Sequence, residues 1–336
     1  MIRRLNRDSR IELLRILAMF MIVLSHLYLF TNWGPDLSPL VSLKLLFWDS
    51  FGPVGAVIFF IITGYFINEK RSINESLCKS QSKIRSVWAK TIGYSWAISL
   101  IFFIMEGSLS KASLQTIFPV ILNEYWFITA YILLVSFSPF LDSLILSLNS
   151  KQLYALNALL IVMQLLETFM NPTVGRLGLA ISCYVLGASI KLDLDILMRV
   201  RTYILVIILF LTIVFDAFSI LGCRYIGISF KRSAHFTQYI PACLIAAIML
   251  ILVLRLHKFN NKFINILALG SFAVYLITEQ ALFRPILWNK IVCIGKLRDS
   301  IYLYPISFIY VAVIYLVCAL IDVFFTFILN KIRKHT

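Results

Sequence analysis

Long apolar runs separated by short polar connections follow one another along almost the whole chain. Each run approaches the length of about 20 apolar residues that a helix needs to cross a bilayer. No internal repeat, low-complexity tract or large polar insertion interrupts the series. The pattern therefore predicts an all-α, polytopic transmembrane bundle of about ten helices, folded as a single domain over residues 1–336. The expected helices lie near residues 11–30, 51–68, 87–105, 117–140, 152–169, 174–190, 202–222, 237–255, 263–283 and 300–330.

The composition makes lipid the expected solvent for most of this chain. Of its 336 residues, 60% are hydrophobic and 14% charged, whereas a soluble domain averages about 45–50% apolar and about 25% charged residues. The net charge of +15 comes from short basic clusters between the apolar runs, with no stripe of interleaved basic and aromatic residues. We therefore expect no nucleic acid to bind. The six cysteines are widely spaced and include no CxxC pair, so we expect no metal site.

The distribution of Lys and Arg predicts the topology. With the N-terminus in the cytoplasm, the inner segments hold about twice as many Lys and Arg residues as the outer loops. Such a bias favours an even number of spans in a plasma (inner) membrane, with both termini cytoplasmic. The outer loops near 223–236 and 284–299 are also basic. They could meet an anionic partner on the outer face, or they could carry ordinary solvated charge.

The first apolar run carries ionisable residues at a depth where membrane helices rarely have them. Arg15 and His26 are eleven positions apart. At about 100° and 1.5 Å per residue, this spacing places them on one helix face, about 16 Å apart along the axis. Glu12 falls on the same stripe and could pair with Arg15. Alone, Arg15 could simply pair with Glu12, and His26 could simply bind a backbone carbonyl. Their presence together on one face favours a functional site, because intramembrane charges usually face the bundle interior or a wet cavity.

The two side chains suit different halves of one reaction. A neutral imidazole can take a proton from an alcohol as that alcohol attacks an activated carbonyl. An Arg nearer the cytoplasm suits a phosphate-bearing donor, because guanidinium makes bidentate contacts with phosphate oxygens. The spacing therefore indicates a donor that enters from the cytoplasm and a reaction deeper in the membrane.

Four stretches, in order, resemble the integral-membrane acyltransferase-3 family. The segment with Arg, ten residues and then His resembles the family's hallmark, and the other three are similar to its second helix, its Tyr-Trp-Phe segment and its late Val-Tyr-Leu-Ile-His segment. Many members have His where this chain has Thr278, and Glu279 is then the nearest titratable substitute. The stretches are 12–26, 55–66, 123–131 followed by Ser138-Pro139-Phe140, and 271–279 followed by Arg284 and Trp288.

The resemblance implies transfer of an acyl group, usually acetyl from acetyl-CoA, to a hydroxyl of a carbohydrate such as O-antigen or exopolysaccharide. The acyl-CoA is then a co-substrate, the acceptor can be lipid-linked, and no bound cofactor is expected. By position, the resemblance gives His26 the catalytic role and Arg15 a catalytic and donor-binding role. Lys83 and Arg85 could hold CoA phosphates or simply follow the positive-inside rule. Expected substrate-binding residues are Tyr65, Trp126, Glu279 and Arg284.

Two other functions remain open from the sequence. A polytopic transporter or flippase for a lipid-linked sugar could use Arg15, His26, Asp216 and Glu279 as a polar pathway, although transporters often show internal repeats. A polysaccharide polymerase usually has a long outer loop, and none here exceeds about 20 residues, judged against the short connections usual in compact domains. Thioester consumption that depends on the protein would distinguish the acyltransferase from both.

Overall fold

The computed structural model describes residues 7–35, 37–67, 72–106, 115–169, 175–228 and 240–332, and every regular element in these ranges is helical. The elements are α2 (Ser9–Phe30), α3 (Pro39–Asp49), α4 (Phe51–Tyr65), α5 (Ile73–Glu106), α7 (Trp126–Ser147), α8 (Ser150–Phe169), α9 (Gly175–Leu192), α10 (Leu194–Arg199), α11 (Thr202–Tyr225), α13 (Ile240–Arg255), α14 (Lys262–Glu279), α15 (Phe283–Ile286), the π-helical η2 (Leu287–Val292), the 3₁₀ η3 (Ile294–Leu297) and α16 (Leu303–Ile332).

Each of the ten predicted helices corresponds to one long helix of this series. Within the described ranges, seven segments are long and apolar enough to cross a membrane. The polytopic helical bundle is therefore confirmed. Which end of the bundle faces the cytoplasm stays a prediction from the charge distribution.

Two predicted boundaries near the site are wrong, and both errors have a local cause. The helix expected at 117 begins only at Trp126, because the preceding residues form turns in which Asn123 has a positive φ of 55°. The helix expected to reach 283 ends at Glu279, because Gln280 is extended with φ −61° and ψ 126°. The chain therefore changes direction at both places, and apolar content alone gives no sign of it.

The short helix α3 was not predicted as a separate element. It has only 11 residues, with Pro39 in its first turn and Ser38 as N-cap, whose side chain accepts from the amide of Val41. Such a length falls well below that of a membrane span. The helix packs on α2 and α11 and leads directly into α4.

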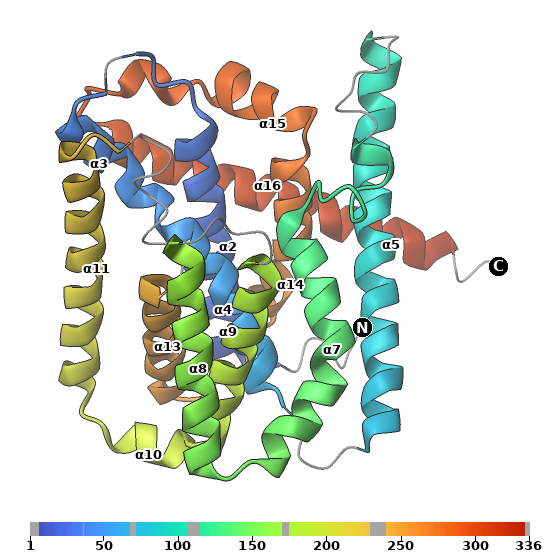
Figure 1. Ribbon diagram of the computed structural model, residues 1–336. Coiled ribbons are helices and arrows are strands. Elements are labelled where there is room, and N and C mark those ends of the chain that lie inside the picture. The colour runs from blue at the N-terminus through green and yellow to red at the C-terminus, as the bar shows by residue number, and fades with distance from the viewer. Residues whose placement is uncertain are drawn as a thin grey trace.

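The helices α2, α4, α9 and α14 form the middle of the bundle, while α5 and α11 lie at opposite edges (Figure 1). The helix α16 crosses behind them obliquely. In the same view α2 runs from the lower end to the upper end. Arg15 is near the start of this helix and His26 is near its end. The most extensive helix pairings are α2 with α4, α4 with α9, and α14 with α2.

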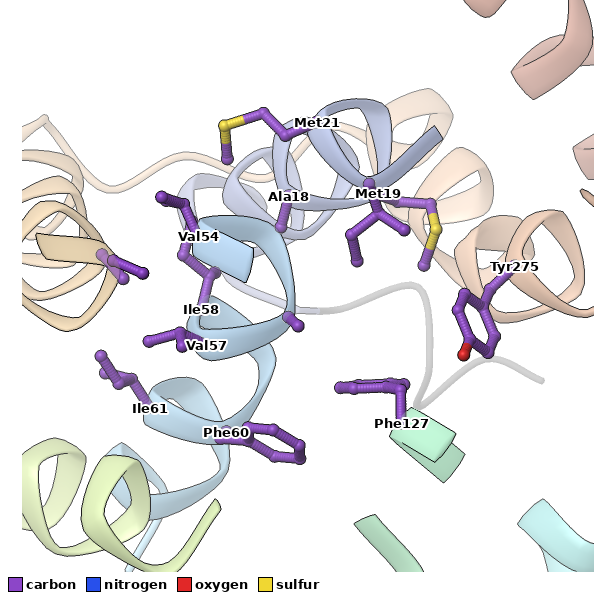
Figure 2. Close-up of a cluster of buried hydrophobic side chains, with 14 of the residues drawn as sticks. Ala18, Met19, Met21, Val54, Val57, Ile58, Phe60, Ile61, Phe127 and Tyr275 are labelled. Atoms are coloured by element: carbon purple, nitrogen blue, oxygen red, sulfur yellow. The ribbon is translucent and has the colours of Figure 1, made fainter. Parts of the chain in front are cut away.

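Close backbone contacts set the position of α4 between its neighbours. A Cβ added to Gly55 would lie 2.3 Å from the carbonyl oxygen of Ala18 on α2, and one added to Gly64 would lie 2.0 Å from that of Tyr184 on α9. Small residues at such crossings let membrane helices approach each other closely. Figure 2 shows Ala18 of α2 facing Val54 and Ile58 of α4 in this core.

Two basic side chains, one on α3 and one at the end of α11, bind backbone carbonyls. Arg224 donates to the carbonyls of Leu37 and Ile228, and Lys44 donates to those of Arg298 and Ser300. Of the charge expected near 223–236 to be either solvated or partner-binding, Arg224 thus binds the protein's own backbone. Residues 229–236 of the first basic loop lie outside the described ranges.

Candidate active site

An unbroken helix places Arg15 and His26 on one face. The helix α2 begins after Asp8, whose side chain accepts from the amide of Arg10, and it continues for 22 residues to Phe30. Its side chains at positions 15, 19, 22 and 26 therefore form one stripe. Of these, Met19 and Ile22 are buried and lie between the two polar ends. The site accordingly has a lower end at Arg15 and an upper end at His26.

At the lower end, one carboxylate serves two guanidinium groups. Glu12 is buried and pairs with Arg15, and Nη1 of Arg7 lies 3.3 Å from its Oε1. The Arg15 guanidinium also lies 5.8 Å from the centre of the Phe66 ring. Because two cations share one anion, this cluster keeps a positive charge that suits a phosphate group.

A second cation approaches Arg15 from α5. Nζ of Lys83 lies 5.0 Å from the centre of the Tyr131 ring on α7, and the same tyrosine is within electrostatic range of Arg15. Arg85 follows Lys83 by two residues, which is about 200° around the helix, so it does not share this face. The structure thus brings Lys83, and not Arg85, toward Arg15.

Tyr65 also belongs to the lower end. It is the last residue of α4, and Nζ of Lys191 lies 5.6 Å from the centre of its ring. Its neighbour Phe66 is the residue that contacts Arg15. The structure therefore places Tyr65 near the Arg15 cluster and does not bring it to His26.

At the upper end, His26 meets a carboxylate from α14. Nδ1 of His26 lies 3.0 Å from Oε2 of Glu279, and Nη1 of Arg284 lies 2.7 Å from Oε1 of the same carboxylate. The side chains of His26 and Glu279 are only 11% and 7% exposed, and that of Arg284 is 30% exposed. A histidine, a glutamate and an arginine thus form one chain of contacts inside the bundle.

This arrangement defines what the imidazole can do. A carboxylate beside Nδ1 favours the tautomer with its proton on Nδ1 and leaves the lone pair of Nε2 available as a base. The second oxygen of Glu279 accepts a hydrogen bond from Nη1 of Arg284. Nδ1 and Oε2 are within hydrogen-bonding distance but are not aligned as donor and acceptor.

The end of α14 brings Glu279 and Arg284 together. Gln280 follows α14 in an extended conformation. Its side-chain Oε1 accepts from the amides of Leu282 and Phe283, where the short helix α15 starts. That helix returns Arg284 to Glu279. Thr278, in contrast, donates its hydroxyl to the carbonyl of Val274 in its own helix. The neighbour Glu279, rather than Thr278, therefore reaches His26.

Aromatic rings surround the imidazole. The ring of Phe30 lies 5.5 Å from that of His26, and the guanidinium of Arg284 lies 4.2 Å from the Phe30 ring centre. The Tyr275 ring lies 6.2 Å from that of His26 and is 2% exposed. Sequence reasoning did not single out Phe30 or Tyr275. For Tyr275 a signal existed, since it precedes Glu279 by four residues and therefore shares its helix face.

Trp126 lies beside this site rather than in it. Its ring faces the guanidinium of Arg176, 4.8 Å away, and the residue is half-buried. Its neighbours Tyr125 and Phe127 are the residues that contact Tyr275, with ring centres 6.0 Å and 5.6 Å apart.

Glu124 ties the start of α7 to the end of α14. Its Oε1 accepts from the amide of Ala281 at 2.7 Å. Burial raises the pKa of the Glu124 carboxyl, while this hydrogen bond and the nearby Arg284 oppose the shift. The contact holds the first turn of α7 beside the residues that contact His26.

The comparisons with known proteins agree with this geometry. The sequence matches the family described as an acyltransferase domain over residues 8–328, which is nearly the whole chain and includes both ends of the site. Comparisons with curated proteins and with solved structures gave no match. The chain therefore belongs to the acyltransferase-3 family of membrane acyltransferases.

Proposed function

We propose that this protein is an O-acyltransferase that moves an acyl group, usually acetyl, from acyl-CoA to a hydroxyl of a cell-surface carbohydrate such as O-antigen or exopolysaccharide. The observation that supports this most directly is the contact of His26 with Glu279 inside the bundle. It supplies an oriented base on the helix face whose other end carries Arg15. Membership of an acyltransferase family supplies the type of reaction.

The reaction follows from the roles of these groups. The acceptor oxygen attacks the thioester carbonyl carbon while Nε2 of His26 takes the hydroxyl proton. The carbonyl electron pair moves to its oxygen and gives a tetrahedral oxyanion. When this collapses, the carbonyl re-forms and the carbon–sulfur bond breaks. The departing CoA thiolate then takes the proton from the imidazolium, which Glu279 has stabilised in the meantime.

The lower end is the proposed donor site. Arg15 and Lys83 flank Tyr131 from two helices, and Lys83 is exposed. Guanidinium and ammonium groups are the usual protein ligands of phosphate. Binding of the CoA phosphates here would direct the acyl end of the donor along α2 toward His26. The buried Met19 lies on that path and would have to change rotamer when the donor enters.

The upper end is the proposed acceptor side. Trp126 and Arg176 lie near the start of α7 and α9, and aromatic faces such as that of Trp126 are suited to contacts with sugar rings. The transporter alternative needs Asp216 in the same pathway. Asp216 is instead on the edge helix α11, which packs mainly on α3 and α13. This placement favours acyl transfer over transport.

The test is acetyl transfer in membrane vesicles that carry equal amounts of each variant. With labelled acetyl-CoA and isolated polysaccharide, the wild-type protein should give labelled glycan and His26→Ala should give none. The matched control is His257→Ala, because His257 is exposed in the connection after α13. Wild-type transfer by His26→Ala would rule out the proposed base. Protein-dependent acetyl methyl signals in the proton NMR spectrum of the polysaccharide would establish acetylation, and shifted sugar resonances would locate the modified hydroxyl.

A further inference from the structure

One polar group beside His26 has no role in the reaction as written above. The hydroxyl of Tyr275 is buried and donates to no acceptor among the described residues, although the backbone amide of Phe127 lies beside its oxygen as a donor. Buried polar groups are nearly always paired, and an unpaired one in a native protein calls for a reason such as a catalytic role. Because a phenol is a hydrogen-bond donor, the missing partner is an acceptor atom.

The hydroxyl points to the start of α7. Figure 2 shows the Tyr275 ring reaching from α14 toward Phe127 at the start of α7, and its oxygen lies beside the Phe127 backbone amide. The helix α7 begins there without any side-chain cap. The first amides of a helix have no partner inside it and carry the positive end of the helix dipole. Tyr275 and these amides therefore offer donors to the same small region.

The local chain keeps this helix start uncapped. Glu124 lies two residues before Trp126, where its carboxylate could cap the first turn, but it accepts from Ala281 instead. The turn before it contains Asn123 at a positive φ of 55°, a conformation that a non-glycine residue adopts at some cost. Both features hold the first amides of α7 beside Tyr275.

We propose that the Tyr275 hydroxyl, with the first backbone amides of α7, forms the oxyanion hole of the acyl transfer; this inference rests on the proposed function. As the acceptor oxygen bonds to the thioester carbon, the carbonyl oxygen gains the negative charge and accepts these hydrogen bonds. When the carbon–sulfur bond breaks, the charge leaves with the thiolate. Tyr275 is then a catalytic residue. Its ring lies 6.2 Å from that of His26, so the base and the proposed donor belong to neighbouring side chains.

The test is Tyr275→Phe, which removes the hydroxyl and keeps the ring that contacts His26, Tyr125 and Phe127. Loss of one oxyanion donor typically lowers kcat by about 10²–10³, so we expect a fall of about a hundredfold with the KM for acetyl-CoA unchanged. The melting temperature should change little, because the removed hydroxyl donated to no acceptor.

The matched control is Tyr28→Phe. Tyr28 is equally buried, but its hydroxyl is bonded to Ser307 at 3.0 Å. This variant should lose thermal stability and keep its kcat. If the wild type transfers acetyl and Tyr275→Phe keeps kcat within about twofold, or loses activity only in proportion to Tyr28→Phe, the oxyanion hole is wrong and the proposed function stands. A wild-type protein that transfers no acyl group overturns both.

Discussion

Nδ1 of His26 lies 3.0 Å from Oε2 of Glu279, although the two residues come from opposite parts of the chain. The contact joins α2 to the last residue of α14. It places a carboxylate beside the imidazole inside a bundle where most neighbours are apolar. Four predictions follow from this contact and from the packing that supports it.

Replacement of the Glu279 carboxylate should slow the acyl-transfer step. In Glu279→Gln the amide no longer stabilises the imidazolium, so kcat should fall by about 10²–10⁴, the range of general acid–base catalysis. The KM for acetyl-CoA should stay within about twofold, because the donor site is at the other end of α2. Initial rates in proteoliposomes measure both constants. The control is Glu75→Gln in the exposed first turn of α5, and equal kcat values for the two variants would contradict the role of Glu279.

Arg284 should act through Glu279. Arg284→Met leaves the buried carboxylate without its cation, so kcat should fall by about tenfold or more, since hydrogen bonds to charged groups contribute about 1.5–3 kcal/mol. In a Glu279→Gln background the same substitution should change kcat far less, because residues in one network are not additive. A double-mutant cycle measures this difference. Fully additive effects would show that Arg284 acts independently, for example on the acceptor.

Arg15 should govern the affinity for the donor rather than the chemical step. Arg15→Lys loses the bidentate geometry of guanidinium, so the KM for acetyl-CoA should rise by about tenfold to a hundredfold, as expected for one lost charge-assisted hydrogen bond. The same variant assayed with acetyl-pantetheine, which lacks the nucleotide and its phosphates, should match the wild type. An equal loss with both donors would mean that Arg15 does not bind phosphate.

Helix packing around α4 should tolerate no added methyl group. In Gly55→Ala the new Cβ would lie 2.3 Å from a backbone oxygen of α2, which cannot move without displacing the helix that carries His26. We expect a lower melting temperature and a loss of activity. In Gly93→Ala a Cβ meets nothing within 4 Å, so this variant should be neutral or more stable by about 0.5–1 kcal/mol. Thermal unfolding in detergent compares the two, and similar curves would contradict the packing argument.

The sequence by itself predicted the membrane bundle and the helix face that carries Arg15 and His26. Runs of about 20 apolar residues fix the number of long helices, because an exposed backbone in hydrocarbon must satisfy its hydrogen bonds within the helix. The shared face of Arg15 and His26 followed from the helical repeat alone, since both residues belong to one unbroken helix. Family resemblance then supplied the reaction.

Only the tertiary structure decided the partners of these residues. The contacts of His26 with Glu279 and of Lys83 with Tyr131 join segments far apart in sequence, and no periodicity relates residues on different helices. Separating Lys83 from Arg85 required knowing which face of α5 meets α7. Only the packed structure shows that the buried Tyr275 hydroxyl donates to no acceptor among the described residues. The helical repeat relates residues within one helix, whereas the chemistry of a catalytic side chain depends on the residues that pack against it from other helices.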